Sequence, residues 1–191
     1  MSIKKDFARR ASGLLVPENR AKLLMAGSYH CELTRTDGSV EEWDTKNLVV
    51  NQGLNYILGA GLAGGSQITA WYLALFTGNY TVLASDTASV IASNASELAA
   101  TYYTAGARQV WTPNSSTVTG QSTSNSSAAA SFTFQNLSSP PTNIYGAFLV
   151  SSATAVGTGG SLFSGAQFAS LKGVANGDVL QITYTYTAAS A

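Results

Sequence analysis

The stretch YHCELTRTDGSVEEW, residues 29–43, decides the fold. In its first half, the apolar residues Tyr29, Cys31 and Leu33 alternate with polar ones, which is typical of a β-strand with one buried face. Asp37-Gly38 follows, and this pair favours a tight turn because both residues tolerate positive φ. Residues 40–43 then return along the first strand. The stretch therefore predicts a β-hairpin.

Further short strands are predicted along the rest of the chain. Residues 71–77 (WYLALFT) form a nearly continuous apolar run, which indicates a central strand covered on both faces. Residues 179–187 alternate like the first strand. We also expect strands at 107–112, 128–135, 144–150 and 160–170, with a polar loop at 114–127. The pattern predicts an all-β fold, an antiparallel β-sandwich or jelly-roll-like domain over residues 27–191.

Few helices are expected, and they lie outside the predicted strands. Residues 3–15 place apolar side chains on one helical face and are bounded by glycine and proline. We therefore expect residues 1–26 to form a helical N-terminal arm. Two short helices are predicted within the domain, one capped by Asn51 and running to Leu58, the other running from Ser93 or Asn94 to Ala100.

Charge is scarce and unevenly distributed. Charged residues make up 10% of the chain and hydrophobic residues 45%, whereas about 25% charged residues is usual for soluble domains. So little charge indicates a surface that partners cover. The net charge of +0 argues against nucleic-acid binding, which needs a basic stripe. No apolar run is long enough to span a membrane, so neither nucleic acid nor membrane is an expected partner.

The residues needed for catalysis are few. The chain has one histidine, His30, and its neighbour Cys31 projects from the opposite face of the same strand. Glu41 and Glu42 face opposite ways and do not form an acid–base pair, and the glycines at 59–65 fit no phosphate-binding pattern. We expect no enzyme activity, no cofactor and no metal site. The single cysteine also indicates folding in a reducing cytoplasm.

Two features are candidates for partner contact. Trp71 and Trp111 lie in apolar strands and are expected in the core, whereas Trp43 is flanked by acids and is expected to touch a partner. Residues 1–22 carry six cations against two acids, a net +4. This segment is either a solvated helix face or an arm that docks on an acidic neighbour. Its candidate contact residues are Lys4, Lys5, Arg9 and Arg10.

An ordered series of phrases between residues 27 and 188 resembles the capsid cement, or decoration, proteins of tailed bacteriophages. The resemblance rests on Asp37-Gly38 and on NLVVNQGLNYIL (47–58), WYLALFTGNY (71–80), YTAGARQVWT (103–112), IYGAFLVSS (144–152), SLFSGAQF (161–168) and NGDVLQITYTYT (176–187). Residues 1–26 depart from it as an N-terminal extension. None of these phrases is a catalytic motif.

The resemblance implies a virion structural protein on the capsid exterior, made in the host bacterial cytoplasm. Its expected partners are the major capsid protein, whose lattice it would stabilise, and itself, as a homodimer or homotrimer. One alternative is a tail, fibre or neck component that acts as an adaptor or binds host glycans through exposed aromatic residues. Another is a virion hydrolase that uses His30 and Glu41.

Overall fold

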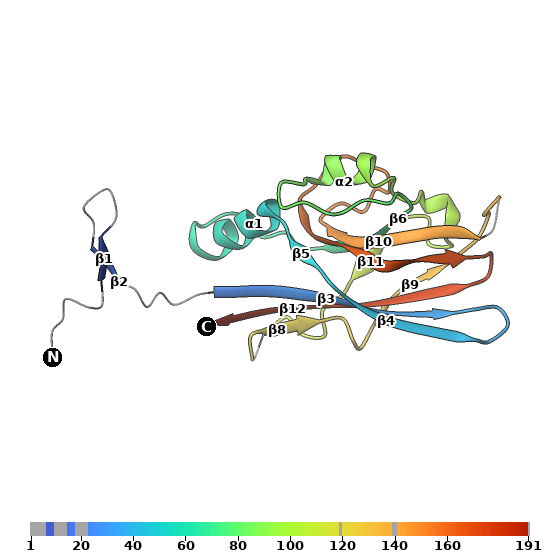
Figure 1. Cartoon of the computed structure of the whole chain (residues 1–191), viewed down its shortest axis with the longest axis horizontal. Helices are drawn as coiled ribbons and strands as arrows, with labels where there is room; N and C mark the ends of the chain where they lie inside the picture. Colours follow the sequence, from blue (N-terminus) through green and yellow to red (C-terminus); the bar gives the residue numbers. More distant parts are fainter. Residues whose placement is uncertain (1–6, 10–14, 18–22, 119, 139–140, 191) are drawn as a thin grey trace.

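The structure is a computed structural model that describes residues 7–9, 15–17, 23–118, 120–138 and 141–190. Two antiparallel sheets pack face to face (Figure 1). The first, here called the hairpin sheet, has the order β4-β3-β12-β8, and β9 also pairs with β12. Its strands are β3 (Leu23–Thr34), β4 (Val40–Lys46), β8 (Ser122–Ser124), β9 (Ala130–Thr133) and β12 (Val179–Ser190).

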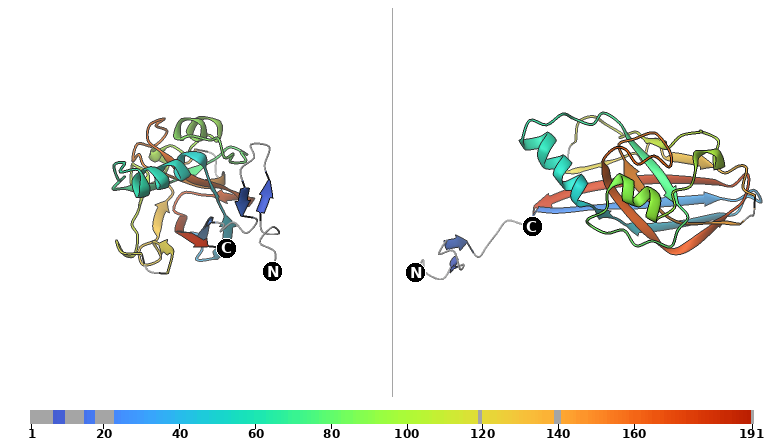
Figure 2. Two further views of the ribbon diagram at one scale, coloured as in Figure 1. Left: turned by 90° about the vertical axis from the view of Figure 1, so that its left-hand side faces the viewer. Right: turned by 90° about the horizontal axis from the view of Figure 1, so that it is seen from above.

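The second sheet, here called the helix-covered sheet, has the order β5-β11-β10-β6-β7. Two helices, α1 (Asn51–Leu62) and α2 (Ala88–Asn94), lie on the same side of the sandwich (Figures 1 and 2). A 3₁₀ turn covers Ala100–Tyr102. The strands are β5 (Leu48–Val49), β6 (Trp71–Phe76), β7 (Gln109–Trp111), β10 (Thr142–Val150) and β11 (Leu162–Val174).

Apolar side chains form two clusters. The larger cluster fills the space between the sheets and includes the predicted inward residues Tyr29, Cys31 and Leu33, all fully buried. The smaller cluster lies under α2, where Ile91 packs with Phe76 and Phe148 of the helix-covered sheet. This sheet is therefore buried on both faces near α2, which explains why β6 is an apolar run rather than an alternating one.

The main predictions from the sequence are confirmed. The chain forms an antiparallel β-sandwich, β3 and β4 form the predicted hairpin, and β6 lies inside its sheet between β10 and β7. Trp71 is buried, and the Trp111 indole N–H donates a hydrogen bond to the Tyr184 carbonyl, 3.1 Å away. Both tryptophans therefore belong to the core or its margin.

Three local predictions are wrong. Helix α1 begins after Val50 rather than an Asn51 cap and continues past Gly59, because a single glycine weakens a helix without ending it. Helix α2 was predicted to begin at Ser93 or Asn94, but it is capped by Thr87 and ends at Asn94. Its buried face is formed by Ala88, Ile91 and Ala92. The polar segment 114–127 contains β8, which gains its hydrogen bonds from β12.

The expected N-terminal helix over residues 3–15 is not found in the part of it that the structure describes. Phe7–Arg9 is a strand, β1, and it pairs antiparallel with β2, Leu15–Pro17. A helix of this length is marginal in water without a surface to pack on, and its apolar spacing alone was not sufficient. Strand β3 also begins at Leu23, ahead of the expected domain boundary at residue 27.

Candidate interaction surface

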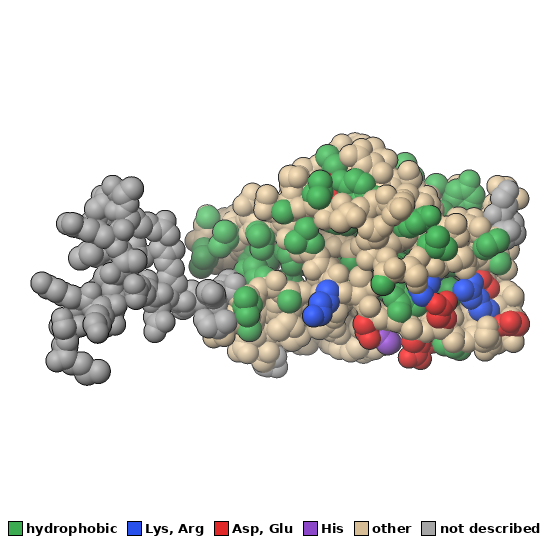
Figure 3. All heavy atoms as spheres, viewed as in Figure 1, with side chains coloured by type: hydrophobic (Ala, Val, Ile, Leu, Met, Phe, Trp, Pro, Cys, Tyr) green, Lys and Arg blue, Asp and Glu red, His purple; other side chains and the backbone are tan. Residues whose placement is uncertain are grey.

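The charged side chains of the sandwich gather at one edge (Figure 3). From residue 23 onward, every charged residue that is not buried lies on β3, on β4, in the turn between them, or at Lys172 near the end of β11. These residues are Glu32, Arg35, Asp37, Glu41, Glu42, Asp44, Lys46 and Lys172. The sequence shows that charge is scarce and unevenly distributed, but only the fold brings Lys172 beside the hairpin.

The remaining charges are buried and have partners inside the protein. The Asp86 carboxylate accepts hydrogen bonds from the Tyr80 hydroxyl at 2.9 Å and from the Leu83 amide at 2.8 Å. Glu97 and Arg108 form an ion pair whose side chains are both 0% exposed. Asp178 is held at the hairpin end. None of these four groups contributes charge to the surface.

The rest of the described surface is therefore uncharged from residue 47 to residue 171. We call its part over α1 and α2 the uncharged helix layer. Three large apolar side chains on this layer face solvent: Leu58 is 52% exposed, Leu62 is 84% exposed and Leu83 is 53% exposed. In Figure 3 the upper half of the sandwich shows apolar and neutral side chains without a red or blue one. Such a surface suits burial against another protein.

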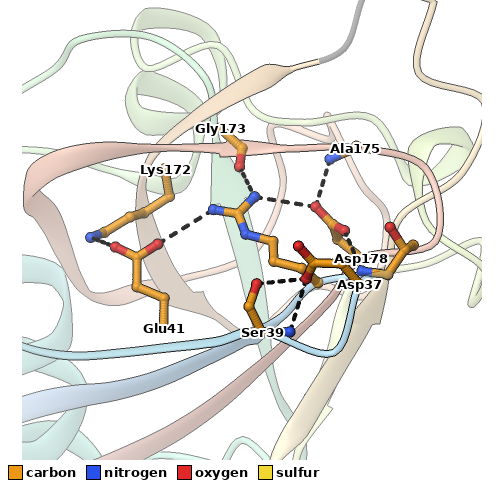
Figure 4. Close-up of polar contacts among 9 residues, drawn as sticks. Asp37, Ser39, Glu41, Lys172, Gly173, Ala175 and Asp178 are labelled. Carbon is orange, nitrogen blue, oxygen red and sulfur yellow. Dashed lines mark hydrogen bonds and ion pairs between the residues drawn. The ribbon is translucent and has the colours of Figure 1, made fainter.

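A polar network fixes the turn end of the β3–β4 hairpin (Figure 4). The Arg35 guanidinium donates to the Gly173 carbonyl, to Asp178 at 3.2 Å and to Glu41 at 3.4 Å. The Asp178 carboxylate also accepts from the backbone amides of Thr36 and Ala175. This network ties the hairpin turn to the turn between β11 and β12, and its role is structural.

Lys172 completes this network. Its ammonium donates to the Glu41 carboxylate, and it also lies 4.5 Å from the centre of the Trp43 ring. The hydrogen bond from Lys172, with the charges of Lys172 and Arg35, lowers the pKa of Glu41 despite an opposing effect of burial. Glu41 is therefore a carboxylate paired with both Lys172 and Arg35.

Trp43, the predicted partner contact, lies on the inward side of β4. It is partly buried, and its ring meets Phe168 edge to face at a centroid distance of 5.3 Å. Its indole N–H is buried and has no hydrogen-bond partner among the residues that the structure describes. The structure thus places Trp43 at the margin of the core. Of the predicted arm contacts, Arg9 lies in β1, while Lys4, Lys5 and Arg10 are outside the described residues.

The expected lack of enzyme activity stays a prediction. It was based on the positions of His30 and Cys31, which the structure places on opposite faces of β3 as expected. His30 is exposed and its Nδ1 lies 3.0 Å from an Asp44 oxygen, whereas Cys31 is buried on the opposite face of β3. Burial raises the pKa of the Cys31 thiol well above its usual range. The four hollows described on the surface of residues 23–190 contain no acid, histidine or cysteine in their linings.

The described residues show neither a metal-binding cluster nor a membrane-spanning helix. Among these residues, no group of three or more His, Cys, Asp or Glu side chains is placed to hold a metal ion. No helix in the same part of the chain has the length and apolar character needed to cross a membrane. Comparison with known proteins also returned nothing: no family model, curated protein or solved structure matches the chain.

Proposed function

We propose that the chain is a structural protein of a tailed-phage virion, a capsid cement protein that binds and stabilises the major capsid protein lattice through the uncharged helix layer. The resemblance of residues 27–188 suggests this class of protein. The observation that carries the proposal is the separation of the surface into a charged hairpin edge and an uncharged layer with exposed leucines. Depletion of charged residues is typical of the buried centre of a protein–protein interface.

The size of the contact can be estimated from single side chains. Fully burying a leucine that was wholly exposed contributes about 1.5–3 kcal/mol. On α1, Leu62 is 84% exposed and can supply most of this amount, whereas Leu58 is 52% exposed and can supply about half of it. One copy would then bind weakly or moderately. If copies of the chain associate with one another, each oligomer makes several such contacts with the capsid lattice. Once one copy is bound, the next copy binds at a high effective concentration, so the oligomer stays on the shell longer than a single copy.

The alternative of a glycan-binding tail or fibre component gains less support. That function was expected to use exposed aromatic rings. All three tryptophans and all nine tyrosines lie in the described part of the chain, and each is buried or partly buried. Trp43, the tryptophan expected to touch a partner, packs on Phe168.

Co-sedimentation with empty capsid shells of the encoding phage tests the proposal. The Leu58→Asp variant should bind the shells at least tenfold more weakly, because it places a charge where an apolar contact forms. Val40→Asp is the matched control: Val40 is 54% exposed, against 52% for Leu58, but lies on the hairpin. Equal loss in both variants, or no loss in either, would refute the assignment of this layer.

A further inference from the structure

The outer face of the β3–β4 hairpin carries acidic charges that the cations of residues 23–190 do not balance. Glu32 and Glu42 are directly opposite each other in the β3–β4 register, and Asp44 is the next outward residue on β4, opposite His30. Like charges in opposed positions destabilise a sheet. We call this surface, formed by His30, Glu32, Glu42, Asp44 and Lys46, the outer hairpin face.

The cations of the sandwich do not neutralise this face. Arg35 and Lys172 are engaged with Glu41 and Asp178, and Arg108 is engaged with Glu97. Within residues 23–190, neither Glu32 nor Glu42 forms an ion pair, and Lys46 is the one cation on the face itself. With His30 neutral, the face therefore keeps a net negative charge.

The complementary charge is present in the same chain. The whole chain has a net charge of +0, and residues 1–22 hold a net +4, so the residues from 23 onward hold −4. Residues 1–22 precede β3, and within them β1 turns back on β2, with Phe7 opposite Pro17. The cations of this segment therefore lie ahead of the sandwich in the chain, where a neighbouring molecule can meet them.

We propose that the outer hairpin face binds residues 1–22 of a second copy of this chain. Strand geometry favours a second copy over the same one. Leu23 pairs with Ser190 at one end of the sheet, whereas Glu32 pairs with Gln181, and the nine residues from Leu23 to Glu32 span about 30 Å. Arg20 and Lys22 directly precede Leu23 in the sequence, at the end of β3 that lies farthest from Glu32. A neighbouring copy can present all six cations.

This inference deepens the self-association that is part of the proposed function, and it can be tested without a capsid. Sedimentation velocity on the full chain should show a dimer or larger oligomer at low salt that weakens as salt rises, because screening reduces contacts between exposed charges. Glu32→Gln with Glu42→Gln should weaken self-association about tenfold at low salt. Asp37→Asn is the control: it removes an exposed acid from the turn, outside the face, and should change self-association by less than twofold.

Charge reversal gives the stricter test. Glu32→Lys with Glu42→Lys should leave the chain monomeric. Adding the opposite reversal in the arm should restore the oligomer, through Lys4→Glu, Lys5→Glu, Arg9→Glu and Arg10→Glu. A monomeric wild-type chain at low salt, an oligomer indifferent to the face variants, or failure of the combined variant to reassociate would each overturn the inference. Binding of the Leu58→Asp variant to capsid shells is measured separately. If this variant loses shell binding but still self-associates, the contact with the lattice and the contact between copies are independent, and each proposal can fail without the other.

Discussion

Replacing Arg108 by methionine should be among the most damaging single changes in the protein. The Arg108 guanidinium donates to both Glu97 oxygens, at 2.8 and 2.6 Å, and to the carbonyls of Ser152 and Gly157, at 3.0 and 3.1 Å. It also lies 5.5 Å from the centre of the Phe148 ring. The substitution leaves the Glu97 carboxylate buried with no cation and two carbonyls without this donor.

The magnitude follows from the burial of the pair. Removing one member of a buried ion pair costs about 3–5 kcal/mol, because the remaining charge has lost both water and its partner. Domains of this size are stable by about 5–15 kcal/mol in total. Arg108→Met should therefore remove a large share of the free energy of unfolding.

Urea unfolding followed by tryptophan fluorescence measures the effect. The midpoint should fall strongly for Arg108→Met, with the denaturant slope unchanged if the native fold is kept. The double variant Glu97→Leu with Arg108→Met should be more stable than Arg108→Met alone, since it removes the stranded carboxylate. A loss below about 1 kcal/mol for Arg108→Met, within the usual range for an exposed pair, would refute the reasoning, as would strictly additive single effects.

Two further predictions concern packing and pH. Gly59→Ala should stabilise α1 by up to about 1 kcal/mol, because a Cβ there meets nothing within 4 Å. Gly53→Ala should lower the melting temperature, because its Cβ would lie 2.3 Å from the Phe163 carbonyl oxygen. If Gly53→Ala melted at a higher temperature than Gly59→Ala, this description of the packing would be contradicted. The lowered pKa of Glu41 should make the wild type more stable than Glu41→Gln above the ordinary glutamate pKa. This advantage should vanish as the pH falls through the folded-state pKa, and melting curves that stay equally separated at low pH would show that Glu41 acts by packing alone.

The strands were largely predictable from the sequence, because each depends on a local pattern. The alternation of apolar and polar residues predicted β3 and β12, and the apolar run at residues 71–77 predicted β6. Strand β8 could not be found in this way. Its three residues, Ser122–Ser124, have no apolar pattern and become a strand only by pairing with β12.

The outer hairpin face depends on a register that residue types alone do not specify. A two-residue turn at Asp37-Gly38 would place Glu32 opposite Trp43. In the structure Thr34 pairs with Val40 and the longer turn includes a hydrogen bond from the Arg35 amide to the Ser39 carbonyl, 2.8 Å long. This shift of one residue places Glu42 opposite Glu32. The hydrogen bond between Arg35 and Asp178 could not be predicted from the sequence either, because these residues are far apart in the chain and meet only in the folded protein.

A reconstruction of the virion to which we assign this chain would show directly where the chain binds. We expect many copies repeated over the capsid exterior, with α1 and α2 against the major capsid protein and the outer hairpin face directed to a neighbouring copy. Finding the chain only at one vertex or in the tail, or finding the charged hairpin edge against the shell and the helices exposed, would contradict it.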